Sequence, residues 1–254
     1  MARKETSNNP QTLLNAVIKL KNAVAFESAG KFESALMSLE EALLLKENYV
    51  DAWLMKGVIL GKSGRCSEAL KCFEKVIYLD SYSTDAWRLK GATLGSLNLH
   101  DKAVDCFAKA LELDPTNLEV RLSLATSFQK LKKYDEALKC YEEAMKQKPN
   151  DPRIDYSIGV MWGNMGNFEK ALSSLEKALR LKPDFTDALL CKGIMLAKLD
   201  RNEEAKLCAK KILDVKGESG KKESSQSNLV NDAIREEYNA AKRRFKMTYS
   251  SNRK

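Results

Sequence analysis

Residues 84–117, TDAWRLKGATLGSLNLHDKAVDCFAKALELDPTN, have the pattern of two short helices joined by a tight turn. Apolar residues recur at helical spacing in both halves: Ala86, Leu89, Ala92 and Leu94, then Ala103, Phe107, Ala110 and Leu111. Asn98 suits the turn because asparagine tolerates a left-handed backbone. Pro115 ends the second helix because proline cannot continue the hydrogen-bond ladder. A unit of this size cannot bury its own apolar faces, so the pattern predicts neighbouring copies.

The pattern recurs along the chain every 34 residues, the period of one class of helix–turn–helix repeat. One position is alanine in every copy: Ala35, Ala69, Ala103, Ala137, Ala171 and Ala205. A second position is always glycine or alanine: Ala23, Gly57, Gly91, Ala125, Gly159 and Gly193. A residue that stays small in every copy indicates a point where two helices approach closely. Six units then follow one another without insertion, at 16–49, 50–83, 84–117, 118–151, 152–185 and 186–219.

These units resemble the tetratricopeptide repeat (TPR) family. In the second unit the match is carried by Trp53, Lys56, Gly57, Leu60, Ala69, Phe73 and Val76, and the other units carry equivalent residues. The resemblance covers about four-fifths of the chain. It implies an all-α fold, a right-handed superhelical solenoid of antiparallel helix pairs. The first helix of each pair would line a concave groove and the second helix would form the convex back.

The resemblance also implies that the inward side of the first helices binds a protein or peptide. The positions it assigns to the groove are Leu20, Val24, Leu54, Met55, Val58, Arg88, Leu89, Leu122, Tyr156, Val160, Leu190 and Ile194. Three acidic residues, Asp51, Asp85 and Glu119, lie along one edge. The lysine–asparagine clamp of chaperone-binding relatives and the asparagine ladder of sugar-transferase relatives are both absent, and only Arg88 remains to hold a carboxylate.

A long apolar floor of this kind predicts a partner, either an amphipathic helix or an extended apolar peptide. The alternative is that these side chains pack against neighbouring first helices and are less exposed than the pattern suggests.

The two ends of the chain depart from the repeat. Residues 1–15 predict a polar leader without a secretory signal, followed by the start of the first helix near Pro10. Residues 214–227 are polar and rich in glycine and serine, which predicts a flexible linker, and 220–227 lie beyond the repeats. Residues 228–254 predict an amphipathic helix and a basic tail, with Val230, Ile234, Tyr238 and Phe245 on one stripe. This helix either caps the last repeat or enters the groove, its own or a neighbour's, in competition with partners.

The formal net charge is +8, and residues 220–254 contribute +5 of it through nine basic and four acidic side chains. The basic balance is therefore a property of the tail. A short basic cluster such as 242–246 is more typical of a solvated chain end than of a nucleic-acid footprint, so we do not expect nucleic-acid binding. No apolar run approaches the ~18 residues that a membrane-spanning helix requires.

Catalytic motifs are missing: there is no phosphate-binding GxxxxGK[ST] and no GxGxxG after a strand. The single histidine, His100, is expected to be a solvated residue of the turn in its unit.

Four of the six cysteines share one repeat position, Cys72, Cys106, Cys140 and Cys208, and predict small semi-buried side chains. Stacked helix pairs lie about 10 Å apart, too far for a disulfide or a shared metal site. We therefore expect no enzymatic activity, no cofactor and no metal, and unpaired thiols fit a reducing cytoplasm.

The expected function is a non-enzymatic scaffold that holds another protein in its groove, with the C-terminal helix as a regulator. One alternative is a self-assembling scaffold that forms homo-oligomers through contacts between groove and tail. A weaker alternative is a nucleic-acid-associated regulator that uses the basic tail.

Overall fold

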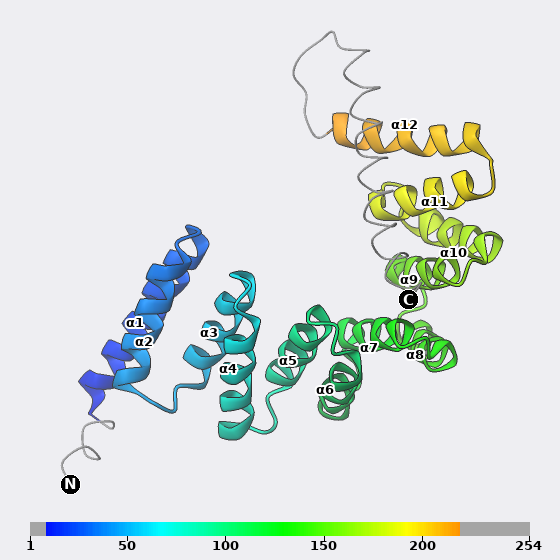
Figure 1. Cartoon of the computed structure of the whole chain (residues 1–254). Helices are drawn as coiled ribbons and strands as arrows, with labels where there is room; N and C mark the ends of the chain where they lie inside the picture. The colour runs from blue at the N-terminus through cyan, green and yellow to red at the C-terminus, as the bar shows by residue number, and fades with distance from the viewer. Residues whose placement is uncertain (1–8, 219–254) are drawn as a thin grey trace. The chain divides into compact units, whose positions relative to one another are not determined.

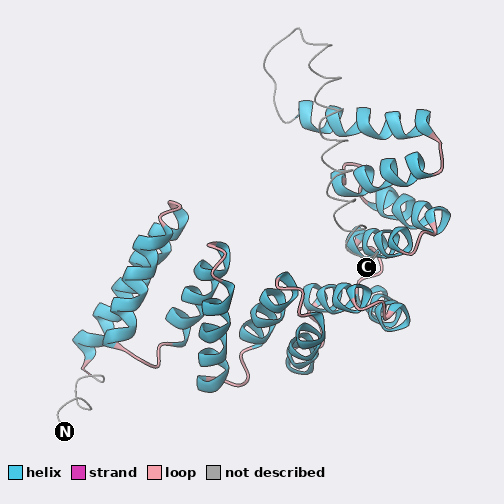
Figure 2. Ribbon diagram, in the orientation of Figure 1, coloured by secondary structure: helices cyan, strands magenta, loops and turns pink. Residues whose placement is uncertain are grey.

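The computed structural model describes residues 9–218, which form twelve helices and no strand (Figures 1 and 2). In chain order the helices are α1 (Pro10–Ser28), α2 (Phe32–Leu45), α3 (Val50–Lys62), α4 (Cys66–Leu79), α5 (Thr84–Ser96), α6 (His100–Leu113), α7 (Leu118–Lys130), α8 (Tyr134–Gln147), α9 (Pro152–Asn164), α10 (Phe168–Leu181), α11 (Thr186–Lys198) and α12 (Asn202–Glu218). The predicted linker at 220–227 and the predicted helix with Val230, Ile234, Tyr238 and Phe245 lie outside the described residues, as do residues 1–8.

The helix boundaries follow the 34-residue register. The second helices begin at Phe32, Cys66, His100, Tyr134, Phe168 and Asn202, each 34 residues after the last. The first helices from α3 onward begin at Val50, Thr84, Leu118, Pro152 and Thr186. Helix α1 is longer because it starts at Pro10, where the Asn9 side chain accepts a hydrogen bond from the Gln11 amide at 3.0 Å. The predicted pattern of helix pairs, and the start of the first helix at Pro10, are confirmed.

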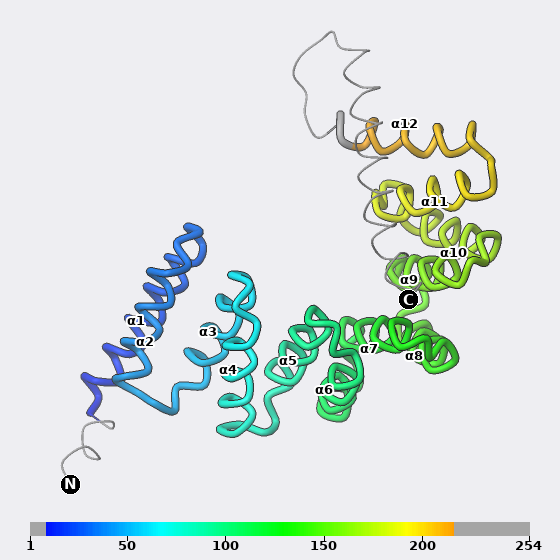
Figure 3. Tube along the Cα trace, in the orientation of Figure 1, coloured from blue at the N-terminus to red at the C-terminus, as the bar shows by residue number. Residues whose placement is uncertain are grey.

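The helices fall into two compact units, α1–α8 and α9–α12, which we call unit 1 and unit 2. Within each unit, every first helix packs against the second helix of its own pair. The second helix then packs against the first helix of the next pair, as α2 does on α3, α4 on α5, α6 on α7 and α10 on α11. The chain can be followed through these pairs in the trace of Figure 3. Each helix therefore packs against its partner within the pair, and successive pairs within a unit pack against each other.

A left-handed residue turns the chain between the two helices of each pair. Positive φ angles occur at Gly30, Gly64, Asn98, Lys132, Gly166 and Asp200, again 34 residues apart. This confirms the prediction for Asn98, whose φ is 60°. The left-handed residue lets the amide that follows it donate back to the end of the first helix, as Leu99 does to the Leu94 carbonyl at 2.9 Å.

The two helices of a pair touch at the small residues that the sequence singled out. Five alanines of the first column, from Ala35 to Ala171, are fully buried, whereas Ala205 in the last unit is partly exposed. Gly57 lies under the ring of Phe73, which would be 2.5 Å from a Cβ atom at that position. Gly91 lies in the same way under Phe107, at 2.8 Å. The aromatic ring of the second helix thus fills the space that the glycine leaves.

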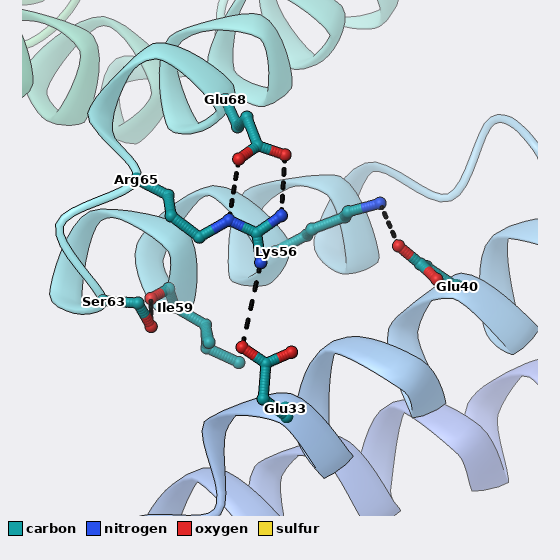
Figure 4. Close-up of polar contacts among 7 residues, drawn as sticks. All are labelled: Glu33, Glu40, Lys56, Ile59, Ser63, Arg65 and Glu68. Carbon is teal, nitrogen blue, oxygen red and sulfur yellow. Dashed lines mark hydrogen bonds and ion pairs between the residues drawn. The ribbon is translucent and has the colours of Figure 1, made fainter.

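Ion pairs mark the junctions between successive pairs. The Lys56 ammonium lies 3.0 Å from Glu40, and Figure 4 shows this contact between α3 and α2. Lys90 with Glu74 at 3.0 Å and Lys192 with Glu176 at 2.7 Å repeat it. Exposed ion pairs contribute up to about 1 kcal/mol each. They therefore favour one alignment of neighbouring pairs, while the apolar contacts supply most of the stability.

Arg65 adds a second polar contact at the turn between α3 and α4. Its guanidinium donates two hydrogen bonds to Glu68, at 2.7 and 2.8 Å, and lies 3.9 Å from Glu33 (Figure 4). This paired geometry fixes the start of α4 relative to α2.

One expectation for the end of the repeats is wrong. Helix α12 continues to Glu218, so residues 214–218 are helical and do not belong to the linker that the composition predicted from Asp214 onward. Val215 and Leu213 keep the helix partly buried in this stretch, which polar composition alone does not reveal.

Gly57→Ala is expected to lower the free energy of unfolding by about 1–3 kcal/mol, because the new methyl group meets the Phe73 ring. Gly61→Ala is the matched control on the same helix, where a Cβ atom meets nothing within 4 Å. It should raise stability by about 0.5–1 kcal/mol through helix propensity. Urea unfolding followed by circular dichroism measures both. Equal stabilisation by the two substitutions would contradict the close approach.

Candidate functional site

The twelve residues predicted to line the groove all lie on first helices. In unit 1 they are Leu20 and Val24 on α1, Leu54, Met55 and Val58 on α3, Arg88 and Leu89 on α5, and Leu122 on α7. In unit 2 they are Tyr156 and Val160 on α9, and Leu190 and Ile194 on α11. Val24 is 43% exposed and the other eleven are partly buried. We call these two sets the first-helix face of unit 1 and of unit 2.

The aliphatic residues on the first-helix face of unit 1 contact the core on one side and solvent on the other. Leu20, Leu54, Met55, Val58 and Leu89 pack against the buried core of α1–α4, yet each keeps part of its surface exposed. Helix α3 also touches α5 directly, and α5 touches α7. Both interpretations of the sequence therefore hold in part: these side chains support their neighbours, and they leave an apolar strip accessible. Their role in binding stays a prediction.

The acidic edge of this face comes from equivalent positions in three helices. Asp51, Asp85 and Glu119 are all exposed, and each lies in the first turn of its helix. A carboxylate is favourable there because the N-terminus of a helix carries partial positive charge.

Arg88 lies between two of these carboxylates. Its guanidinium donates to Glu119 at 3.2 Å and to Asp85 at 3.2 and 3.3 Å. Sequence reasoning left Arg88 as the one residue able to hold a partner's carboxylate. The structure shows that its charge is already balanced from two sides, so the edge remains net negative.

The face of unit 2 has a different chemistry. The Cys191 thiol lies 3.9 Å from the hydroxyl of Tyr156, to which it donates, and the Tyr156 ring lies 5.0 Å from the ring of Phe185. Burial raises the pKa of the Tyr156 hydroxyl and raises the pKa of the Cys191 thiol to about 11. Both groups are therefore neutral at physiological pH, and this face is aromatic and uncharged at its centre.

Sequence reasoning missed Arg121 on α7, which is buried. Its guanidinium donates to the Pro115 carbonyl at 2.7 Å and pairs with Glu143. Two tryptophans at the equivalent positions make the same contact with the preceding loop: the Trp53 indole donates to the Glu47 carbonyl at 2.8 Å, and the Trp87 indole to the Ser81 carbonyl at 3.1 Å. The sequence did contain a signal for this role, because Arg121 lies at the register position of Trp53 and Trp87. Arg121 ties a loop to its helix and is not open to a ligand.

Family comparisons agree with this geometry. A tetratricopeptide repeat model matches residues 98–157, and a second one matches residues 50–82 and 156–185. The chain contains tetratricopeptide repeats. No curated protein matches the TPR chain in sequence.

Several solved structures share the fold. YrrB, described as a TPR protein with an unusual peptide-binding site, is 27% identical, with a TM-score of 0.57 over 70% of this chain and 91% of YrrB. PilW, described as a widely conserved type IV pilus biogenesis factor, is 20% identical, with a TM-score of 0.68 over 78% of this chain and 91% of PilW. MamA 41-end from Desulfovibrio magneticus RS-1 is 18% identical, with a TM-score of 0.62 over 67% of this chain and 97% of that MamA chain. These similarities confirm the predicted fold class, an all-α TPR solenoid.

Catalytic groups are sparse in the part of the TPR chain that the structure describes. Residues 9–218 contain no cluster of histidine, cysteine and acidic residues suited to a metal ion. All six cysteines are free, and burial raises the pKa of Cys72 and Cys140 to about 11. Such thiols are protonated at neutral pH and are poor nucleophiles.

The expectation for His100 is wrong. It is the first residue of α6 rather than a solvated turn residue, and its Nδ1 atom is buried without a hydrogen-bond partner. Burial lowers its pKa, so the imidazole is neutral at physiological pH.

None of the described helices combines the length and the apolar character needed to cross a bilayer.

The thiols should differ in their reactivity with iodoacetamide. Cys191 has a pKa of about 11, so only about one molecule in a thousand carries the reactive thiolate at pH 8. We expect Cys66, which is partly exposed, to be alkylated first, and the rate at Cys191 to rise about tenfold per pH unit below its pKa. Mass spectrometry of the folded protein measures this, and the urea-unfolded chain is the control in which all six should react. Fast alkylation of Cys191 at neutral pH would reveal an activated thiol instead.

Proposed function

We propose that this TPR chain is a non-enzymatic interaction scaffold that binds another protein or peptide on the first-helix face of unit 1. The observation that carries the proposal is the row of partly exposed aliphatic side chains on α1, α3 and α5, which pack against the core beneath them, and the partly buried Leu122 on α7 continues this row. Accessible apolar surface in a rigid row is typical of interaction sites. The similarity to YrrB, a TPR protein with a peptide-binding site, supports the same function.

The favoured ligand is an amphipathic helix or an apolar segment that carries basic residues. Its apolar anchors would lie along Leu54, Val58 and Leu89, and its lysine or arginine side chains beside Asp51 and Glu119. A ligand carboxylate is disfavoured at this edge, because Asp85 and Glu119 already occupy Arg88. We place the scaffold in the reducing cytoplasm, since its six cysteines are all unpaired.

A random-peptide display selection against the full chain should enrich amphipathic sequences with lysine or arginine on one flank. Binding of the enriched peptides should fall at least about tenfold with Val24→Glu or Leu122→Glu, which place a charge on the apolar strip. Fluorescence anisotropy measures the affinities.

Leu44→Glu is the matched control, because Leu44 is 87% exposed on the second helix α2. It introduces the same charge outside the first-helix face and should leave binding unchanged. Enrichment of acidic peptides, or equal loss of binding with Leu44→Glu, would reject the proposed site.

The second part of the proposal concerns regulation by residues 228–254, which lie outside the described residues. Their seven basic residues outnumber their three acidic residues and suit the acidic edge of unit 1, and their apolar stripe suits its apolar strip. The surface of α12 favours this binding mode over the alternative, in which residues 228–254 pack on α12 and cap the last repeat. Lys206 there is exposed at the register position where Leu36 and Leu172 are buried, so α12 presents a lysine where a capping helix needs an apolar contact.

Competition by this tail predicts a difference between two chain lengths. A labelled peptide of residues 228–254 should bind the chain ending at Glu218 at least about tenfold more tightly than it binds the full chain, whose own tail already occupies the face. Glu119→Gln should weaken this binding, and added salt should weaken it further because the charges are exposed. If the shortened chain precipitates and binds no peptide, the tail is a cap.

A further inference from the structure

The first helix exposes an apolar patch, and one of its residues, Ile18, occupies a register position that is buried in the later first helices. Leu14 is 52% exposed, Ile18 45% and Val17 38%, and all three lie on α1 within one and a half turns. We call these three residues the α1 patch. Large apolar side chains that gather on one helix in this way indicate a surface meant to be covered.

The repeat register shows what normally covers such a surface. The position of Ile18 is occupied by Ala52, Ala86, Val120 and Ala188 in α3, α5, α7 and α11, and all four are 0% exposed. Ala25 lies on α1 about two helical turns after Ile18. Its register position is occupied by Ile59 in α3 and Met195 in α11, which are also buried. In these helices the second helix of the preceding pair covers that side. Within residues 9–218 no helix performs this role for α1.

The far end of the repeats cannot supply the missing partner from another copy. The second helices that contact a following first helix all carry an aliphatic residue at one register position: Leu36, Leu70, Val104 and Leu172. Helix α12 presents the exposed Lys206 there instead. Head-to-tail contact between copies would press this ammonium against Ile18 and remove it from water without a counter-charge, which is costly.

The basic tail of the chain is also a poor match. Glu27 is the only acidic residue of α1, and it already pairs with Lys62 of α3. Among the exposed polar residues beside the patch, Gln11, Asn15 and Asn22 carry no charge and Lys21 is basic. A segment with strong positive charge finds nothing to neutralise it there, whereas a second uncharged apolar surface does match.

We propose that two copies of this chain pair through their α1 patches about a two-fold axis. Helix α1 has 19 residues and is about 28 Å long, enough for two copies to pack side by side in opposite directions. Lys21 falls on the same side, and its long aliphatic stem carries the ammonium to the rim. The contact centres on Leu14 and Ile18, while Val17 and Lys21 occupy the register positions of Asp51 and Met55, so the patch borders the first-helix face of unit 1 along α1.

Sedimentation velocity of the full chain should show a monomer–dimer equilibrium without larger species, because a two-fold contact closes on itself. Ile18→Asp and, separately, Leu14→Asp should weaken the dimer at least about tenfold, since each buries a charge in the contact. Leu44→Asp, at a similarly exposed leucine on α2, is the matched control and should dimerise like the native chain. Circular dichroism checks that each variant is folded.

A mixing experiment separates a two-fold contact from any other. A tagged Ile18→Asp chain should capture the untagged native chain poorly, because every two-fold pair needs both patches. Capture as efficient as that by the tagged native chain would mean that the native α1 patch docks on a different surface, and would overturn the proposal.

Two further results would also overturn it. One is a native chain that stays monomeric at every concentration tested. The other is a full chain that is monomeric while the chain ending at Glu218 dimerises, because the tail would then be the occupant of the patch.

Discussion

The close approach of the two helices in each pair is the constraint on which the rest of this structure depends. It requires a small residue on the first helix and a fixed alanine on the second, and it lets a ring such as that of Phe73 lie where Gly57 has no Cβ atom. Because the contact recurs in every pair, the helices, the left-handed turns and the inter-pair ion pairs all follow one 34-residue register. The same register lines up one side of the first helices, which is how four separate helices contribute to a single face in unit 1.

Features that belong to the register could be predicted from the sequence, and features that depend on one copy alone could not. The left-handed turn, the alanine column and the helix starts each recur in six units. Each copy therefore supports the same prediction. The pairing of Arg88 with Asp85 and Glu119 depends on side chains from two neighbouring helices, and periodicity does not say whether a cation faces a ligand or its own carboxylates. The extension of α12 beyond Asp214 was missed for another reason: composition predicts a linker there, but partial burial of Leu213 and Val215 continues the helix.

The register also shows that one structural task can be done by different chemistry. Trp53, Trp87 and Arg121 occupy the same position and all donate to the carbonyl six residues before them. An indole brings apolar area with one donor, whereas the guanidinium brings charge that must be balanced, and Glu143 supplies that balance. A search for repeats by residue identity would treat Arg121 as a break in the pattern. The hydrogen bond is kept although the residue type is not, so geometry identifies the equivalence where the letters do not.

The surfaces of unit 1 divide by charge, and this division bears on how a scaffold would work. The first-helix face has carboxylates along its edge, whereas the α1 patch is neutral and lies beside uncharged amides. A basic ligand is attracted to the carboxylates of the first-helix face and finds no carboxylate at the α1 patch. Pairing through the α1 patch would give each assembly two first-helix faces. A partner with two binding segments would then be held at both, and the second segment would bind at a high effective concentration once the first is bound. Weak, partly exposed apolar anchors are suited to such an arrangement, because each site can release its segment quickly while the assembly as a whole retains the partner.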